Sequence, residues 1–227
     1  LFGPGNQFVT VAKQLATKFG VAIDMPAGPS ELLIMADHTA NPAFLASDLL
    51  SQAEHGTDSQ VILVSTDENT LLETSEQIRI QTQVLDRQFI IEKALENKKL
   101  ILVKSNEEAA ELINYYSPEH YSICTANNSF FVNNITNAGS VFIGPYTPES
   151  AGDYASGTNH TLPTNGYAKA YSGVNLDSFL KHISFQEITK QGLNTIGNTI
   201  ELMAEAEGLM AHKNAVTIRL KSIDDES

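Results

Sequence analysis

The sequence of this 227-residue chain predicts an α/β fold: a parallel or mixed sheet with flanking helices in a Rossmann-like main domain, then a helical C-terminal tail. Short apolar runs at 31–36, 60–65 and 99–103 alternate with stretches of helical periodicity. The run at 60–65 is apolar almost throughout, as in strands covered on both faces. Hydrophobic residues make up 42% of the chain and charged residues 18%, a composition typical of globular proteins.

The first thirty residues predict a glycine-rich turn, a helix and a short strand. Asn6 is the expected N-cap of a helix at 7–19. Four apolar residues keep helical spacing in it: Phe8, Ala12, Leu15 and Phe19. The turn could hold a phosphate, but a dinucleotide fingerprint requires a third glycine where Phe8 stands. Residues 21–24 then predict a short strand.

The next helix, at 41–56, has sequence signals at both ends. Asn41 is a good N-cap, Pro42 suits the first helical position, and Gly56 can adopt the left-handed conformation that ends a helix. Gln52 and His55 are then three residues apart on one face of the last turn, close enough to share a ligand. By itself this spacing is more typical of a solvated face than of a metal site, and Gln is an unusual zinc ligand.

Helical composition continues over most of 67–97. Asn106 is the expected cap of a helix that reaches about residue 116. Glu119 and His120 follow in a loop that enters the strand at 121–125. Ligands in open α/β sheets gather at the loops that leave strands, so a pair in a loop that enters a strand is ambiguous. Without other evidence, an exposed turn that ends the helix is the more common interpretation.

A strand at 139–144 precedes the least regular stretch, residues 145–173. Loops of this length inside compact domains are usually functional or disordered. This one carries several Tyr and little charge, which favours a folded active-site loop. Its polar candidates are Glu149, Asp153, Asn159 and His160.

The C-terminal part predicts a short strand at 184–188, a long helix at 189–210, a break at 211–215 and a final strand at 216–223. The helix has a narrow apolar stripe, a pattern that often packs on another subunit. Glu207 and His212 stand near its end.

Charge and cysteine content exclude several functional classes. A formal net charge of −13 argues against binding to nucleic acid. Cys124 is the only cysteine, in an apolar run where a small buried residue is expected rather than a nucleophile. The sequence has no apolar run long enough to cross a membrane and no signal-peptide pattern, so we expect a cytoplasmic protein. It opens in a strand-to-helix turn without Met, which suggests a fragment or processed product.

Six motifs together resemble histidinol dehydrogenase, in order from Phe2 to about Leu220. They are FGPGN (2–6), DMPAGPSE (24–31), DLLSQAEHG (48–56), SPEH (117–120), PESAGDYASGTNHTLPT (148–164) and EAEGLMAHKNAV (205–216). The resemblance implies oxidation of L-histidinol to L-histidine through histidinaldehyde, with one Zn²⁺ and two NAD⁺, in histidine biosynthesis. It covers the C-terminal half of the family's chain. We accordingly expect a remnant of the dinucleotide-binding domain at 1–29, a main domain with metal and catalytic residues at 30–174, and a dimerisation segment at 175–227.

The resemblance also implies roles for individual residues. Glu119 and His120 match the catalytic acid and base residues, and Asn6 matches a residue that contacts the cofactor. The implied zinc ligands are Gln52, His55, Asp153 and His212. Substrate contacts are implied for these four ligands and for Ser30, Glu149, His160 and Glu207. In this family Glu207 and His212 reach the partner's site, which implies a homodimer with an exchanged C-terminal tail.

Two other interpretations remain open. A zinc-dependent hydrolase could use the same mixed ligand set, with the adjacent Glu119 activating water. Alternatively, this chain is a catalytically inactive fragment that binds only metal or ligand. A cysteine-dependent aldehyde oxidation is not expected, because Cys124 lies outside the matching motifs.

Overall fold

The computed structural model describes residues 1–3 and 5–225. The chain forms two compact units, Leu1–Leu180 and Lys181–Ser227. Pro4 of the predicted glycine-rich turn and the last two residues lie outside the described part. The expected domain limits at residues 29 and 174 stay a prediction. No described helix is both long enough and apolar enough to cross a bilayer.

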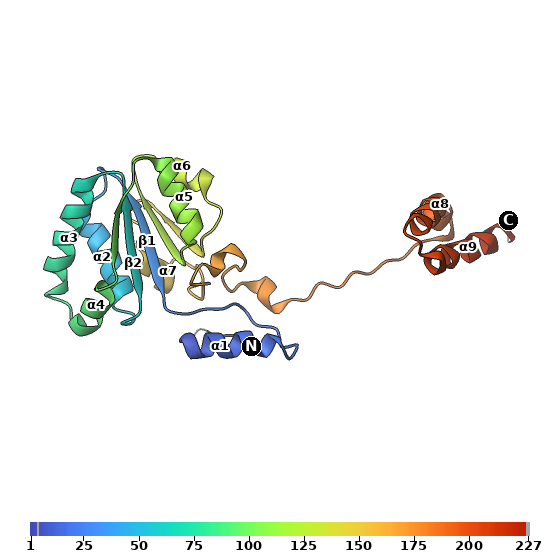
Figure 1. Ribbon diagram of the computed structural model, residues 1–227, viewed down its shortest axis with the longest axis horizontal. Helices are drawn as coiled ribbons and strands as arrows, with labels where there is room; N and C mark the ends of the chain where they lie inside the picture. Colours follow the sequence, from blue (N-terminus) through green and yellow to red (C-terminus); the bar gives the residue numbers. More distant parts are fainter. Residues whose placement is uncertain (4, 226–227) are drawn as a thin grey trace. The chain divides into compact units, whose positions relative to one another are not determined.

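The first unit is built on a five-stranded sheet, which confirms the predicted α/β class (Figure 1). All four strand pairs are parallel, in the order β3-β2-β1-β4-β5. The strands are β1 (Glu31–Ala36), β2 (Gln60–Ser65), β3 (Lys99–Leu102), β4 (His120–Cys124) and β5 (Ser140–Ile143). All residues of β1 and β4 are buried, as expected for central strands covered on both faces.

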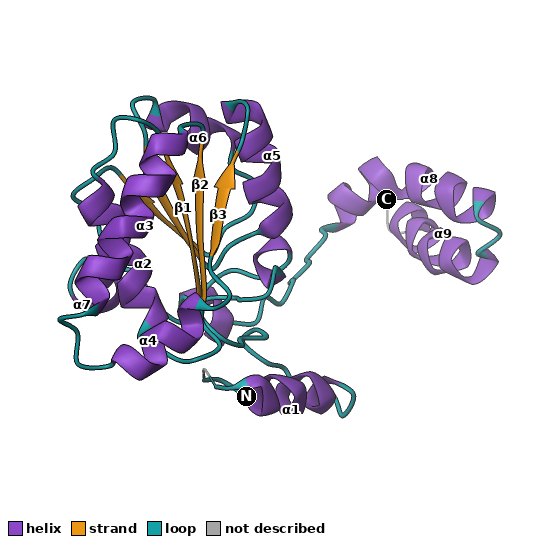
Figure 2. Cartoon of the chain, turned by 60° about the vertical axis from the view of Figure 1, so that its left-hand side comes forward, coloured by secondary structure: helices purple, strands orange, loops and turns teal. Residues whose placement is uncertain are grey.

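Helices cover both faces of the sheet (Figure 2). One apolar core joins the sheet to α2 (Pro42–Ala53), α3 (Glu68–Thr82) and α4 (Gln88–Leu95). The other joins it to α5 (Asn106–Tyr116) and α6 (Asn128–Asn134). Alternate residues of β1 supply the two cores, because successive side chains of a strand point to opposite faces.

The N-terminal helix α1 (Gln7–Thr17) packs with its polar face inward, contrary to the expected apolar stripe. Thr10 and Lys13 are buried, whereas Phe8 is 81% exposed and Phe19, just beyond the helix, is 84% exposed. Polar contacts attach the helix: the hydroxyl of Thr10 donates to the carbonyl of Ala27, and the ammonium of Lys13 pairs with a carboxylate.

The predicted strand at 21–24 is wrong. The segment instead forms two backbone hydrogen bonds with the first residue of the chain. The terminal amine donates to the carbonyl of Ala22, and the amide of Asp24 donates to the carbonyl of Leu1. The Asp24 carboxylate is the partner of Lys13 and also accepts from the amides of Gly3 and Met25.

Two predicted helix signals are also wrong. Gly56 does not have a positive φ; α2 ends earlier, and Glu54 caps it in a right-handed conformation. Asn106 is the first residue of α5 rather than its cap, because the side chain of Ser105 accepts from the amide of Glu108. The Asn41 cap and Pro42 start of α2 are confirmed.

The long loop contains elements that the sequence did not reveal. α7 (Glu149–Tyr154) and the 3-10 helix η1 (Tyr167–Lys169) interrupt it, and a second 3-10 helix, η2 (Leu176–Phe179), follows it. α6 was missed as well. All four are short, three to seven residues, so hydrophobic periodicity is too brief to detect.

The second unit is a helical hairpin of α8 (Lys190–Ala206) and α9 (Met210–Asp225). The predicted strand at 184–188 is wrong, because this segment has no regular structure and its residues are exposed. The predicted break at 211–215 and strand at 216–223 are wrong too, because α9 runs through both segments. The apolar residues at 216–223 also fit the helical period of 3.6. Gly197 lets the hairpin close, because a Cβ there would lie 2.8 Å from Leu220.

Candidate active site

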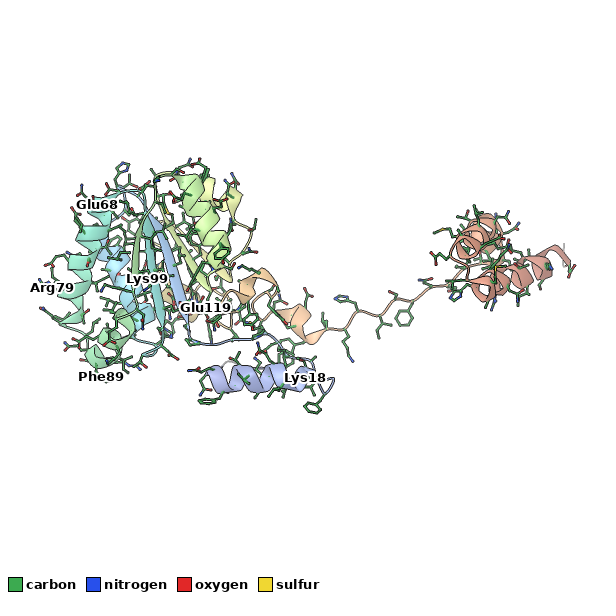
Figure 3. The ribbon with its side chains drawn as sticks, in the orientation of Figure 1. Lys18, Glu68, Arg79, Phe89, Lys99 and Glu119 are labelled. Carbon is green, nitrogen blue, oxygen red and sulfur yellow. The ribbon has the colours of Figure 1, made fainter. Side chains whose placement is uncertain are left out.

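A cavity of about 300 Å³ opens at the amino ends of the central strands. It lies at the opposite edge from the usual ligand position of doubly wound sheets. The labelled Glu119 marks this edge in Figure 3. Twelve residues line the cavity: Ala27, Gly28, Ser30, His55, Glu119, His120, Asp153, Tyr154, His160, Thr161, Leu162 and Thr164.

The turn between α5 and β4 positions Glu119 and His120. Ser117 takes a left-handed conformation with φ of 60° and its amide donates to the carbonyl of Ile113, which ends α5 and redirects the chain. Pro118 follows and cannot continue a helix. Gly139 allows the adjacent strand to approach, because a Cβ there would lie 2.6 Å from the carbonyl oxygen of Glu119.

The backbone of Glu31 holds the side chains of both Glu119 and His120. Its amide donates to Oε2 of Glu119 at 2.8 Å, and its carbonyl oxygen lies 3.0 Å from Nδ1 of His120. A carbonyl can only accept, so Nδ1 carries the proton in the neutral ring and Nε2 keeps its lone pair. This is the tautomer that a base requires at Nε2.

Burial favours the neutral forms of both Glu119 and His120, so it shifts their pKa values in opposite directions. Glu119 is 4% exposed and His120 is 5% exposed. Burial lowers the pKa of His120 to about 4 and raises the pKa of Glu119 to about 9, because both charged forms lose hydration. The neighbouring carboxylates of Glu31 and Asp153 further raise the pKa of Glu119. At neutral pH His120 is therefore a neutral base and Glu119 a carboxylic acid.

A second group in the site has the chemistry of a metal centre. One potential ligand atom from each of His55, Glu149 and Asp153 lies within 4.8 Å of the other two. Glu149 and Asp153 are one turn apart on α7, and His55 follows the end of α2. Burial raises the pKa of Glu149 well above its usual value, with the charges of Asp153 and Glu119 adding to the effect. A bound cation would offset this accumulation of negative charge.

Two buried side chains, one on α2 and one on α7, have polar atoms without partners among the described residues. Both amide atoms of Gln52, which is 0% exposed, and Oε2 of Glu149 have no hydrogen-bond partner in the described part of the chain. Leaving such groups unpaired is costly, so each is suited to a ligand. Mixed imidazole and oxygen donors are a set that Zn²⁺ accepts. The residues present therefore fit a zinc ion.

The cavity brings together six of the predicted site residues from separate segments. They are Ser30, His55, Glu119, His120, Asp153 and His160. Glu149 approaches the same place, with Oε1 3.7 Å from Nδ1 of His120. Asn6 is not among the lining residues; its side chain caps α1 by accepting from the amides of Phe8 and Val9. Glu207 and His212 belong to the second unit, and their part in this site stays a prediction.

Sequence reasoning missed two features of the site. It assigned Glu149 to the substrate, whereas its carboxylate also groups with potential metal ligands. It did not single out Glu31, although a Glu that opens an otherwise apolar strand is a recognisable signal. Cys124 is buried as expected, and burial raises the pKa of its thiol to about 11, which disfavours the reactive thiolate.

The histidinol dehydrogenase family model matches residues 1–220. The chain belongs to the histidinol dehydrogenase family. A histidinol dehydrogenase of Bacteroides fragilis is 61% identical over 98% of this chain and 52% of its own length. The chloroplastic histidinol dehydrogenase of Arabidopsis thaliana is 52% identical over 99% of this chain and 49% of its own length.

A solved histidinol dehydrogenase has the same fold. The crystal structure of the enzyme from Elizabethkingia anophelis is 60% identical and matches with a TM-score of 0.94, over 98% of this chain and 52% of that chain. This chain thus spans about half the length of the histidinol dehydrogenases that it matches.

Proposed function

We propose that this chain provides the metal and acid–base half of a histidinol dehydrogenase site. The reaction is the oxidation of L-histidinol to L-histidine through histidinaldehyde, with two NAD⁺. The observation that supports this proposal is the cavity. It brings Glu119 and His120 close to a group of potential metal ligands, which are His55, Glu149 and Asp153. Membership of the family favours this reaction over hydrolysis by the same residue types.

Zinc would be held by Gln52, His55 and Asp153, with His212 as the fourth ligand, and when bound it supplies a Lewis acid that orients the nitrogens of histidinol. NAD⁺ supplies the hydride acceptor. Asn6 remains the proposed cofactor contact. Because its side-chain oxygen already caps α1, such a contact would use the amide nitrogen as a donor.

His120 is the proposed base for the alcohol step. Its Nδ1–H is directed at the carbonyl of Glu31, so Nε2 is the nitrogen that would accept the hydroxyl proton as hydride leaves the alcohol carbon. The lowered pKa keeps the ring neutral and ready to accept at neutral pH. The Glu31 carbonyl then stabilises the imidazolium by accepting from Nδ1.

Glu119 is the proposed base for the aldehyde step, in which it would take a proton from the water that attacks the carbonyl carbon. It must first lose its own proton. Burial is the main cause of its raised pKa and the charge of Asp153 adds to it, so a cation held by Asp153 would lower the pKa. Ser30 and His160 line the cavity and are the proposed substrate contacts together with Glu149 and the zinc ligands.

The remaining proposals concern the assembly. The family resemblance supports a homodimer in which Glu207 and His212 complete the partner's site. It also supports a role in histidine biosynthesis in the cytoplasm. Light scattering on the purified chain measures its mass. A monomer at micromolar concentration would contradict the dimer, and recovery in the membrane fraction would contradict the location.

The activity test separates the two half-reactions. In a chain of full family length, we expect His120→Asn to slow NADH formation from histidinol by ~10² to 10⁴, the usual effect of removing a general base. We expect Glu119→Gln to slow mainly NADH formation from added histidinaldehyde. Equal losses in both half-reactions for Glu119→Gln would contradict this division, and product formation without NAD⁺ would favour a hydrolase. Thr82→Val, a buried substitution in α3, is the control.

A further inference from the structure

We propose that Glu31 is a positioning residue of this site, with its backbone and its side chain performing separate tasks. The backbone holds the side chains of Glu119 and His120, as described above. The carboxylate holds the loop that forms the opposite wall of the cavity. The inference rests on the proposed function, because its consequence is measured on histidinol.

The carboxylate of Glu31 is tied to the loop at Asn165. Glu31 is 1% exposed, and its Oε1 accepts a hydrogen bond from the backbone amide of Asn165 at 2.7 Å. Asn165 has a φ of 53°, a left-handed conformation that costs energy unless the surroundings maintain it. A hydrogen bond from its amide to the buried Glu31 side chain is suited to that task.

A second hydrogen bond fixes the same point. The amide of Gly28 donates to Oγ1 of Thr164 at 2.6 Å, and Thr164 is buried. Gly28 precedes β1 and Glu31 opens it, so both bonds attach the loop to the start of that strand.

The anchored segment lines the substrate cavity. His160, Thr161, Leu162 and Thr164 all contribute to the wall that faces Glu119 and His120. Two hydrogen bonds hold the middle of this segment: the amide of Val174 donates to the carbonyl of Thr161, and the side-chain amide of Asn159 donates to the carbonyl of Val174. The anchor at 164–165 fixes its other end, so without the anchor this wall of the cavity loses its attachment to the start of β1.

This arrangement predicts a specific kinetic pattern. Replacing the side chain of Glu31 leaves its amide and carbonyl in place, so Glu119 and His120 keep their partners. Loosening the loop weakens histidinol binding instead. A loss of fold would lower kcat and the amount of active protein together, whereas loss of positioning raises KM with little change in kcat.

Three variants test the proposal, each made in a histidinol dehydrogenase of full family length that contains this sequence, with zinc supplied. Glu31→Ala removes the acceptor, whereas Glu31→Gln keeps an oxygen that can accept from the Asn165 amide. Thr164→Val removes the other bond from the loop side. Thr82→Val is the matched control, a buried Thr in α3 whose hydroxyl bonds within its own helix.

We expect Glu31→Ala and Thr164→Val to raise KM for histidinol about 10- to 100-fold, the scale of one charged or buried hydrogen bond, with kcat within about threefold of the wild type. Glu31→Gln should restore KM to within about threefold. Hydrogen exchange should show faster exchange at 158–165 in the Ala variant than in the wild type or the Gln variant. Thr82→Val should change neither.

Several outcomes would overturn the proposal. They are an unchanged KM in Glu31→Ala, a Gln variant as impaired as the Ala variant, or unchanged exchange at 158–165. If Glu31→Ala does not fold, Thr164→Val carries the same KM and exchange criteria. A wild-type protein that shows neither turnover nor calorimetric binding of histidinol would instead refute the proposed function. That failure is distinguishable, because it appears in the wild type and not only in the variants.

Discussion

At the scale of single residues, burial gives His120 and Glu119 opposite protonation behaviour within one cavity. Neither side chain is unusual in sequence. Both lie at the start of a buried strand, where hydration is lost and a backbone group of Glu31 is the nearest polar partner. Protonation is therefore set by position rather than by residue type.

The tautomer and protonation of His120 give the first prediction. We expect its ring in the metal-free protein to stay neutral down to about pH 4, with the proton on Nδ1. Nitrogen-15 NMR of the imidazole groups measures both properties, and His120→Asn identifies the signal by its loss. A ring protonated near pH 6.5, or a proton on Nε2, would contradict the geometry.

The second prediction concerns the pH dependence of stability. The pKa of Glu119 is about 9 in the folded protein and near 4.5 when unfolded, so the folded state binds more protons between these values. Stability therefore falls as pH rises through this window, by up to about 1.4 kcal/mol per pH unit for one group.

Glu119→Gln removes this titration, so its stability should fall less steeply. The clean range is pH 7 to 9, because His120 contributes an opposite slope between about pH 4 and 6.5. Urea unfolding of the metal-free proteins measures both slopes. Parallel curves for wild type and variant would mean that Glu119 does not keep its proton in the folded state.

At the scale of elements, the close contact between β4 and β5 sets the position of Glu119. We expect Gly139→Ala to reduce turnover by about tenfold or more, because the new Cβ would lie 2.6 Å from the Glu119 carbonyl and force a shift. Val141→Ala, in β5 just beyond Gly139 and partly exposed, is the control. Histidinol turnover is measured, and wild-type rates in Gly139→Ala would show that the strands accommodate the change elsewhere.

The outward apolar face of α1 gives another prediction at this scale. Phe8 and Phe19 are mostly exposed, and exposed apolar clusters favour association. We expect the double substitution Phe8→Ser, Phe19→Ser to reduce concentration-dependent self-association without changing the melting temperature. Sedimentation velocity across concentrations measures this. Val84→Ser, at a residue that is 81% exposed, is the control and should change nothing.

At the scale of the whole molecule, zinc should couple to stability. A ligand that binds only the folded state adds about 2.7 kcal/mol at a hundred times its Kd. We therefore expect Zn²⁺ to raise the melting temperature and a chelator to reverse the effect. His55→Ala should abolish the shift, whereas His38→Ala, at an exposed His outside the site, should retain it. A chelator without effect on the zinc-loaded chain would show that the site does not form.

The amino-acid sequence alone was enough to predict the α/β class, all five strands of the sheet to within one residue and the Asn41–Pro42 start of α2. These features depend on local signals, such as capping groups and short apolar runs, which the chain carries without reference to distant residues. The motifs also identified Glu119, His120, His55 and Asp153 as belonging together, although spacing alone left Glu119 and His120 ambiguous.

Tertiary packing determines which helix faces are buried and which site residues are charged, and neither can be predicted from local sequence. The apolar stripe of α1 faces outward because Thr10 and Lys13 find polar partners in the loop before β1. Residues 216–223 form a helix because their apolar side chains suit both periods and Leu220 packs against Gly197 of α8. Glu31 forms hydrogen bonds with Asn165, Glu119 and His120, which are 88 to 134 residues away in the sequence. The parallel pairing of β1 and β4 brings Glu31 beside Glu119 and His120, and no local sequence pattern encodes this proximity.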